Sequence, residues 1–318
     1  MAQFCARRVL SGVPRFPFHH WFPLTDTHST HQIDQSTVSR NPNARIFILA
    51  NQKGGVGKTT TAVNTATILA ARGYRVLLID IDPQGNTTSS LGVDKSNLPG
   101  STYDVLVDEV PIVEAIVLDV RPGLDLLATT ATLAAAEVEL VSAVNREGRL
   151  SRACAVIRPL YDVVLIDSPP SLGLLTVNAL TAANAVIVPI QCEFLALEGV
   201  SQLITTVDLV KRHLNPTLDV VGILMTMFDG RTRLSTLVVE EVRRHFPDRI
   251  FSTIIPRSVR LAEAPSYGQS ISEYDSSSKG GDAYDAFVDE LIARAALGPP
   301  QRRGTSASGS NPSTMPAG

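Results

Sequence analysis

Short apolar runs alternate with longer stretches of mixed polarity along most of this chain. The runs consist mainly of Val, Ile and Leu, as in strands that are covered on both faces. The longer stretches, such as residues 58–72, follow the helical period. The pattern predicts strands at residues 45–50, 75–80, 124–128, 163–167, 185–190, 220–225 and 250–254.

Strands that are separated by helices usually form a parallel sheet, because each crossover returns the chain to the same edge. The predicted fold class is therefore α/β: a doubly wound, mainly parallel, twisted sheet with helices on both faces. Ligands of such sheets bind beyond the carboxyl ends of the strands. Residues that directly follow a predicted strand are thus the first candidates for function.

The two ends of the chain lack this pattern. Residues 1–43 are rich in Pro, Thr, Ser and His, have no helical or strand periodicity, and predict a flexible extension. Residues 298–318 are of low complexity and predict a disordered tail. The alternating pattern therefore predicts one domain over residues 44–297.

Charge is distributed unevenly along the chain. The 318 residues include 28 Lys and Arg against 31 Asp and Glu, a net charge of −3. Residues 205–260 nevertheless carry nine basic and six acidic side chains, whereas residues 80–150 carry four and twelve. A local basic surface is enough to attract a polyanion, whatever the net charge of the chain.

Cysteine usage and hydropathy exclude some classes of protein. Cys5, Cys154 and Cys192 are odd in number and far apart, and fit neither a disulfide framework nor a CxxC metal site. Polar residues, Gly or Pro interrupt every apolar run before the roughly 20 residues that a membrane-spanning helix needs. We therefore expect neither an integral membrane protein nor a disulfide scaffold.

A glycine-rich run joins the first predicted strand to the first predicted helix. It reads Lys53-Gly54-Gly55-Val56-Gly57-Lys58-Thr59-Thr60. Glycines let the backbone curl so that several N–H groups point at one phosphate, and the start of the helix adds partial positive charge. Lys58 would reach the β- and γ-phosphates, and the Thr59 hydroxyl would ligate Mg²⁺. Lys53 cannot easily serve the same phosphate from the same side, but it can project toward a second subunit.

Carboxylates end two of the predicted strands. Asp80 and Asp82 follow one apolar run, and Asp167 ends another. This is the form that a magnesium-site carboxylate takes in P-loop enzymes. Asp167 would hold Mg²⁺ through water, since Mg²⁺ dehydrates reluctantly. Asp80 and Asp82 alternate across their strand, so that one can face the metal while the other orients the attacking water.

The glycine-rich run resembles the deviant Walker A box of the ParA/MinD ATPases, which are a class of P-loop NTPases. Lys53 matches the signature lysine of that box. Other runs resemble the ParA/Soj branch, which partitions chromosomes and plasmids. The similarity covers about residues 44–297. The runs that carry it are residues 82–86 (DPQGN), 167–173 (DSPPSLG), 193–199 (EFLALEG), 255–260 (IPRSVR), 263–268 (EAPSYG) and 278–281 (SKGG).

The resemblance implies a slow ATPase that uses ATP and Mg²⁺ and forms an ATP-sandwich homodimer. Lys53 would cross into the partner's nucleotide, Lys58 would hold phosphate, and Asp82 would position the hydrolytic water. Thr59, Asp80 and Asp167 are the metal candidates. The nucleotide-binding candidates are Gly54, Gly55, Val56, Gly57, Lys58, Thr59 and Thr60, with Glu198 reaching across the dimer and Met227 and Pro256 at the adenine.

The resemblance also implies partners. The ATP dimer would bind DNA without sequence preference, and a ParB-like protein would stimulate hydrolysis, in a cytoplasmic, nucleoid-associated protein. The DNA candidates are Arg243, Arg244, Arg257, Arg260 and Lys279. The sequence interleaves no aromatic residues with these cations, so that phosphate contacts rather than base stacking are expected.

Three other functions deserve comparison. A MinD-like membrane switch needs a basic amphipathic helix near the C-terminus, but residues 284–297 are acidic. A nitrogenase-type iron protein needs two suitably placed cysteines in each subunit, and Cys154 and Cys192 lack such flanking motifs. A nucleotide-gated scaffold that positions cargo other than DNA stays open, although the basic segment 205–260 is more typical of DNA binding.

Overall fold

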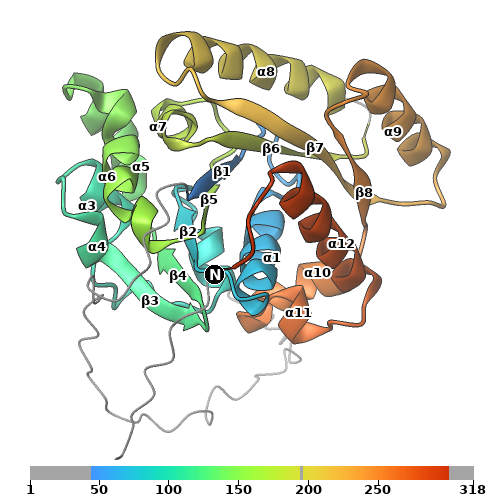
Figure 1. Ribbon diagram of the computed structural model, residues 1–318, viewed down its shortest axis with the longest axis horizontal. Coiled ribbons are helices and arrows are strands. Elements are labelled where there is room, and N and C mark those ends of the chain that lie inside the picture. Colours follow the sequence, from blue (N-terminus) through green and yellow to red (C-terminus); the bar gives the residue numbers. More distant parts are fainter. Residues whose placement is uncertain (1–43, 194–195, 301–318) are drawn as a thin grey trace, which may run out of the picture. The chain divides into compact units, whose positions relative to one another are not determined.

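The computed structural model describes residues 44–193 and 196–300, without the side chains of residues 196–198. The predicted extension over residues 1–43 and residues 301–318 of the predicted tail lie outside this part. Within it, helices and strands alternate as the hydrophobic pattern predicts (Figure 1).

The described residues form an eight-stranded sheet with the order β3-β4-β2-β5-β1-β6-β7-β8. Seven strands are parallel, and only β3 runs antiparallel to its neighbour β4. The strands are β1 (Arg45–Leu49), β2 (Val76–Asp80), β3 (Ile116–Arg121), β4 (Leu124–Leu127), β5 (Val163–Asp167), β6 (Ala185–Gln191), β7 (Asp219–Phe228) and β8 (Ile250–Pro256). The predicted fold class is confirmed.

Side chains that alternate along the strands face two separate cores. In β1, Ile46 and Ile48 belong to one core, and Phe47 and Leu49 belong to the other. All four side chains are buried, because helices cover both faces of the sheet (Figure 1). This double cover explains why the strands consist of continuous rather than alternating apolar residues.

The helices divide between the two cores. The first core includes residues of α3 (Thr102–Leu106), α4 (Ile112–Ala115), α5 (Leu133–Glu139), α6 (Arg149–Ile157), α7 (Leu174–Ala182), α8 (Ala196–His213) and α9 (Arg233–His245). The second includes residues of α1 (Lys58–Ala71), α10 (Val259–Glu263), α11 (Ile271–Tyr274) and α12 (Lys279–Arg294), next to the short α2 (Asn86–Ser90). The 3-10 turns are η1 (Leu140–Ser142), η2 (Arg146–Gly148), η3 (Arg158–Leu160) and η4 (Ala264–Tyr267).

All seven predicted strands are confirmed, with ends that differ by at most three residues. The pattern did not predict β3. This edge strand is mostly half-buried, its register shifts between Val117 and Arg121, and Asp119 has a positive φ of 50°. Its apolar run, residues 116–118, is short and stops at Asp119, and the strand pairs on one side only, so that the hydrophobic pattern does not reveal it.

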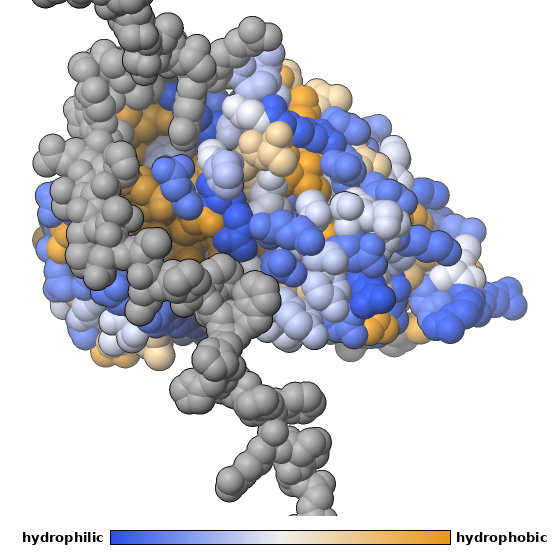
Figure 2. Space-filling view, turned by 90° about the horizontal axis from the view of Figure 1, so that it is seen from below, coloured by the Kyte–Doolittle hydropathy of each residue, from blue (hydrophilic) through white to orange (hydrophobic). Residues whose placement is uncertain are grey.

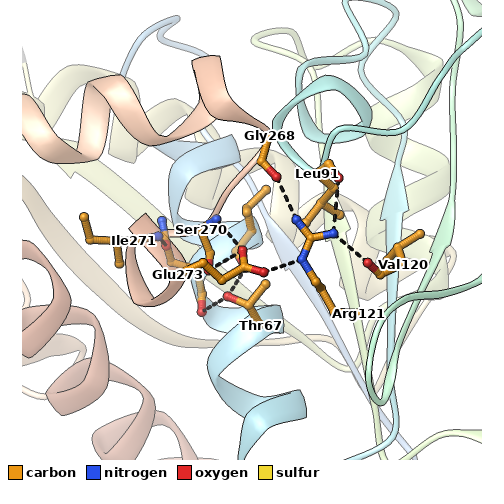
Figure 3. A network of polar contacts seen from close by, with 10 residues as sticks. Thr67, Leu91, Val120, Arg121, Gly268, Ser270, Ile271 and Glu273 are labelled. Carbon is orange, nitrogen blue, oxygen red and sulfur yellow. Dashed lines mark hydrogen bonds and ion pairs between the residues drawn. The ribbon is translucent and has the colours of Figure 1, made fainter. Parts of the chain in front are cut away.

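Arg121, at the end of β3, joins two segments that are far apart in the sequence (Figure 3). Its guanidinium donates to the carbonyl oxygens of Leu91 (3.4 Å) and Gly268 (2.7 Å) and forms an ion pair with Glu273. Glu273 in turn accepts hydrogen bonds from the backbone N–H (2.7 Å) and hydroxyl (2.9 Å) of Ser270, at the start of α11. Arg121 therefore fastens the end of α2 to the segment before α11.

The same two segments touch through glycines. Gly92 and Gly268 both have positive φ values, of 72° and 64°. A Cβ atom on Gly268 would lie 2.9 Å from the Cα of Gly92, which is closer than atoms can approach. Only glycine meets both demands, the left-handed backbone and the close contact.

Polar residues predominate over the right-hand part of the face in Figure 2, and the apolar residues there are interspersed among them. No helix in the described ranges 44–193 and 196–300 is long and apolar enough to cross a membrane. The apolar residues of α12, namely Tyr284, Phe287, Val288 and Leu291, are buried in the second core.

We expect Arg121→Ala to lower the free energy of unfolding by about 1–2 kcal/mol, because the carbonyl oxygens of Leu91, Val120 and Gly268 and the carboxylate of Glu273 lose a partly buried charged donor. Urea unfolding followed by circular dichroism measures this change. Arg152→Ala is the control, because Arg152 is 51% exposed and lies 3.9 Å from Glu109, its ion-pair partner. Equal stability of the two variants would contradict a fastening role for Arg121.

Candidate nucleotide site

The glycine-rich run forms a loop between β1 and α1. Gly55 and Gly57 have positive φ values of 74° and 87°, a backbone conformation that residues other than glycine rarely adopt. Gly57 precedes α1, and no side chain caps this helix, so that its first N–H groups remain available to an anion. The carbonyl oxygen of Val56 accepts a hydrogen bond from Thr226 Oγ1 at 2.8 Å, which fastens the loop to β7. The loop has the backbone of a phosphate cradle.

The two lysines of the loop lie in different environments. Lys58 is buried, and its Nζ donates to the carbonyl oxygens of Asn51 (3.1 Å) and Lys53 (3.2 Å). The side chain of Lys53 is 43% exposed, and its Nζ lies 3.0 Å from Glu193 Oε2. Lys58 therefore points into the loop, while Lys53 lies at its rim.

Asn51 supports this loop in a way that the sequence did not reveal. Its Nδ2 donates to the carbonyl oxygen of Pro189 in β6 at 2.7 Å, and its Oδ1 accepts from the backbone N–H of Lys53 at 3.0 Å. The side chain is buried. It therefore ties the start of the loop to the neighbouring strand, directly before Gln52, which stands where many P-loops have glycine.

Asp80 and Asp167 lie side by side at the ends of β2 and β5, because these strands pair in register. Both side chains are fully buried. Asp167 Oδ2 accepts hydrogen bonds from the hydroxyls of Thr59 and Thr87, each at 2.7 Å. Asp167 Oδ1 is buried and has no hydrogen-bond partner among the described residues. Asp167 thus has an oxygen to offer to a ligand.

The oxygens of Asp80 are already engaged. Oδ2 accepts from the N–H (2.9 Å) and the hydroxyl (2.7 Å) of Thr88, and Oδ1 accepts from the N–H of Asp82 at 3.3 Å. These contacts favour a supporting role for Asp80 beside Asp167. Asp82 is buried as well, and its Oδ1 accepts from the N–H of Gln84 at 3.0 Å.

The buried charges shift one another's protonation. Burial, and next the charge of Asp167, raise the pKa of Asp80 to about 7. Burial also raises the pKa of Asp167 to about 6, against the opposing effect of hydrogen bonds from Thr59 and Thr87. Burial lowers the pKa of Lys58, while the charges of Asp167 and Asp82 oppose this shift. Lys58, Asp82 and Asp167 therefore share one electrostatic environment.

These residues fit Mg²⁺ and a phosphate chain. The Thr59 hydroxyl and the Asp167 carboxylate are hard oxygen donors, which Mg²⁺ prefers, and Asp167 Oδ1 lacks a protein partner in the described structure. No group of three or more His, Cys, Asp or Glu in this part of the chain could hold a metal alone. This sparse donor set suits Mg²⁺, which usually completes its octahedron with water and phosphate oxygens.

The remaining nucleotide candidates lie around the loop. Gly54, Thr59 and Thr60 belong to the loop and the first turn of α1, and both threonine side chains are half-buried. Met227 and Pro256 lie at the carboxyl ends of the paired strands β7 and β8, and Met227 has a positive φ of 53°. Glu198 lies in α8, but its side chain is outside the described part. These assignments stay predictions.

The structure separates the five predicted DNA-contacting residues into two groups. α9 begins shortly after the carboxyl end of β7 and ends shortly before the amino end of β8. Arg243 and Arg244, in its last turn, thus lie about 15 Å along the helix from Arg233, near the opposite edge of the sheet. α9 thus separates Arg243 and Arg244 from the candidates that lie at the carboxyl ends of the strands.

The second group lies at the carboxyl edge. Arg257 donates its N–H to the carbonyl oxygen of Phe228 at 2.9 Å, Arg260 is in α10, and Lys279 begins α12. Gly280 contacts Leu261, which brings Lys279 next to α10. Arg231, which the sequence analysis did not name, lies at the same edge, is 88% exposed and forms an ion pair with Asp229 at 2.7 Å.

Aromatic residues that are not interleaved with these cations in the sequence lie beside one of them in the structure. The Arg260 guanidinium lies 5.8 Å from the centre of the Tyr274 ring, and Tyr274 stacks on Tyr267 with ring centres 5.2 Å apart. Tyr267 is 67% exposed. Arg260 lies in α10, Tyr267 in η4 and Tyr274 in α11, and these three elements fold back on one another.

The amino-acid sequence is similar to known proteins along most of its length. Residues 44–220 match a protein family described as an AAA domain. The chain is 51% identical over 249 residues to the sporulation initiation inhibitor protein Soj of Bacillus subtilis. This alignment covers 78% of this chain and 98% of that protein. The chain is 49% identical over 259 residues to the chromosome partitioning protein ParA of Caulobacter vibrioides, which covers 81% and 97%.

Solved structures share the fold. A Mycobacterium smegmatis protein named cobyrinic acid a,c-diamide synthase, with a bound ATP analogue and magnesium, has a TM-score of 0.70 and 41% identity, covering 80% of this chain and 96% of that chain. A plasmid partition protein of Borrelia burgdorferi has a TM-score of 0.64 and 25% identity, covering 79% and 99%. The residues of the loop and the two carboxylates thus belong to a fold that holds ATP analogues with magnesium.

We expect the melting temperature of the nucleotide-free protein to fall as the pH rises from about 5 to about 7.5. The pKa values of Asp80 and Asp167 in the folded state, about 7 and about 6, lie above their ordinary value of 3.8. The folded state therefore binds protons more tightly than the unfolded state in this window, and loses that stabilisation as the pH rises. Differential scanning fluorimetry at several pH values measures the fall.

Asp167→Asn is the matched control for this pH dependence. Asparagine does not titrate, but it keeps an oxygen that can accept from Thr59 and Thr87, and it removes a negative charge beside Asp80. The fall should therefore be shallower in this variant. A fall that Asp167→Asn leaves unchanged, or a melting temperature that rises through the window, would contradict the raised pKa values.

Proposed function

The chain belongs to the Soj/ParA family of partitioning ATPases, and we propose that two copies of it close around two Mg–ATP molecules to form a dimer that binds DNA. In this proposal, assembly follows ATP binding and disassembly follows ATP hydrolysis. DNA segregation is then the result of a cycle of binding and release. The name of the Caulobacter vibrioides relative, a chromosome partitioning protein, supports a chromosomal substrate.

The observation that carries the proposal is the arrangement of the two loop lysines. Lys58 is buried within the loop, where it can hold the phosphates of its own subunit. Lys53 lies at the rim and contacts only an exposed carboxylate, that of Glu193, among the described side chains. A cation at the rim can reach a phosphate that is bound by a second subunit facing it.

Each residue near the phosphates has a distinct part in hydrolysis. Lys58 would hold the phosphates and offset their charge, and the loop N–H groups would orient them. Asp82, beside Lys58 and Asp167, would orient the attacking water. Thr59 and Asp167 would hold Mg²⁺, which neutralises phosphate charge when bound.

ATP can drive assembly only if it binds the dimer more tightly than the monomer. A contact between Lys53 and the partner's triphosphate supplies this difference. On assembly Lys53 would leave Glu193, which costs little because the ion pair is exposed. Hydrolysis would remove the contact and weaken the dimer.

Sequence-independent contacts with phosphates suit the basic residues at both edges of the sheet. We propose that Arg257, Arg260 and Lys279 contact DNA together, and that Arg243 and Arg244 form a separate contact. Two sets of cations in one dimer raise the apparent affinity through effective concentration. Binding through phosphates would associate the dimer with the nucleoid and would weaken with salt.

A ParB-like partner would set the time of release. A switch with a fast intrinsic ATPase would dissociate before it reached its cargo, so that slow turnover and stimulation by a partner suit this proposal. The packing of α12 favours DNA over a membrane as the bound surface, because the apolar residues of this helix are buried in the core. A membrane switch would need them on the surface.

We expect Lys53→Ala to bind ATP with nearly unchanged affinity but to weaken the ATP-dependent dimer at least about 100-fold, because each dimer loses two charge-assisted contacts across its interface. Analytical ultracentrifugation with a non-hydrolysable ATP analogue measures the dimer, and isothermal titration calorimetry measures nucleotide binding.

Lys58→Ala is the contrasting variant. It should lose nucleotide binding itself, because Lys58 is the cation within the loop. A dimer of unaltered stability in Lys53→Ala would contradict the contact across the interface. Absence of a dimer in the unaltered protein at saturating analogue would overturn the proposed function.

We expect charge reversal of either basic group to weaken DNA binding at least about tenfold at low salt, and to lower the salt dependence of the affinity, because phosphate contacts are lost. The variants are Arg243→Glu with Arg244→Glu, and Arg257→Glu with Arg260→Glu. Fluorescence anisotropy with labelled duplexes of two unrelated sequences, at several salt concentrations, measures both effects. ATP-dependent dimerisation should be unchanged.

Arg152→Glu is the control for the effect of charge alone, since Arg152 lies on α6, outside both groups. Its DNA affinity should stay close to that of the unaltered protein. Unchanged affinity in one double variant would remove that group from the DNA surface, and equal loss in Arg152→Glu would mean that net charge decides binding.

A further inference from the structure

Two consecutive threonines of α2 bind two different carboxylates. Thr87 Oγ1 donates to Asp167 Oδ2, and Thr88 Oγ1 donates to Asp80 Oδ2, each at 2.7 Å. Both threonines are fully buried. α2 follows Gly85, whose positive φ of 62° turns the chain back over the ends of β2 and β5. The short helix is thus attached to the sheet through the carboxylates of the nucleotide site.

We propose that Thr87 is a positioning residue for the magnesium site, holding the Asp167 carboxylate in the orientation that serves the ion. This inference deepens the proposed function, since it rests on Asp167 as the magnesium carboxylate. Metal-binding carboxylates commonly depend on such hydrogen-bond donors, which fix the ligand without touching the metal. Neither the sequence motif nor the resemblance pointed to the Thr87 hydroxyl.

The hydrogen bonds around Asp167 carry the argument. Its Oδ2 accepts two hydroxyl donors, from Thr59 and Thr87, while its buried Oδ1 has no partner among the described residues. Thr59 is itself a candidate ligand, so that its oxygen is needed at the ion. The Thr87 hydroxyl has no other hydrogen bond among the contacts of the described structure, and it is the donor to Asp167 that is not also a candidate ligand.

The same contact joins the metal site to the hydrolytic loop. Thr87 lies shortly after Asp82, and the connecting turn is short, with Gly85 N–H bonded to the carbonyl oxygen of Asp82 at 2.8 Å. A bond from Thr87 to Asp167 therefore also limits how far the Asp82 loop can move from the carboxylate. Loss of the hydroxyl would loosen both.

Four side chains at position 87 separate the hydroxyl from packing. Thr has a hydroxyl and a methyl group, Ser only the hydroxyl, Val only the methyl groups, and Ala neither. We expect Thr87→Val and Thr87→Ala to lower the Mg²⁺ affinity of the nucleotide complex by about tenfold, whereas Thr87→Ser should stay close to the unaltered protein. If one variant fails to fold, the other three still distinguish the two causes.

The measurement is a titration of Mg²⁺ into protein with a fluorescent ADP analogue, next to nucleotide binding in EDTA. In EDTA all four proteins should bind the analogue within about twofold of one another, since Thr87 is assigned no contact with nucleotide. The proposal would be overturned if the Mg²⁺ affinity fell in Thr87→Ser and Thr87→Ala but not in Thr87→Val. It would also be overturned if the nucleotide affinity fell equally with and without Mg²⁺.

This test does not depend on dimerisation or DNA binding, because ADP and Mg²⁺ bind to one subunit. Failure of the Lys53 experiment would leave the Thr87 result intact, and the reverse also holds. A decrease in melting temperature of similar size in Thr87→Ser and Thr87→Val, without any difference in Mg²⁺ affinity, would mean that Thr87 has only a structural part.

Discussion

The structure depends on one electrostatic constraint: three carboxylates and one lysine are buried together at the carboxyl edge of the sheet. Asp80 and Asp167 adjoin each other because β2 and β5 pair in register, and Asp82 lies beyond them. Lys58 is the cation in their midst. Buried charges are costly unless they are paired and hydrogen-bonded, so that the surrounding loops are shaped to supply donors. The loops around the site therefore take the conformations that bring hydrogen-bond donors to these carboxylates.

The hydrophobic pattern predicted most of the sheet and the nucleotide loop, because both depend on local sequence. Continuous apolar runs mark strands with helices on both sides, and Gly55 and Gly57 mark a turn that only glycine makes easily. What the pattern missed depends on distant contacts. Asn51 binds Pro189 in β6, and Arg260 meets Tyr274 only after α10, η4 and α11 fold back. No spacing along the chain encodes such contacts.

The division of the basic residues follows from the same limit. Arg243 and Arg257 are close in sequence, but β8 lies between them and takes the chain from the amino end to the carboxyl end of the strands. The short separation in sequence therefore does not bring these two arginines close together in space. By contrast, Lys279 is distant in sequence and adjoins α10, because Gly280 allows α12 to approach Leu261. The candidate basic residues are thus grouped by the end of the strands at which they lie, not by the segment of the chain that carries them.

Arg121 connects the nucleotide site with the candidate basic residues near α10 and α11, which lie at the same carboxyl edge of the sheet. α2 is bound to the site carboxylates through Thr87 and Thr88, and its end is bound through Arg121 to the segment before α11. Arg260, in turn, lies over Tyr274 at the end of α11. The links from the site carboxylates to α11 are hydrogen bonds and an ion pair, and the last link, to Arg260, is a contact with an aromatic ring. Because hydrogen bonds are directional, the first links fix the orientation of α2 relative to α11 more closely than apolar packing alone would.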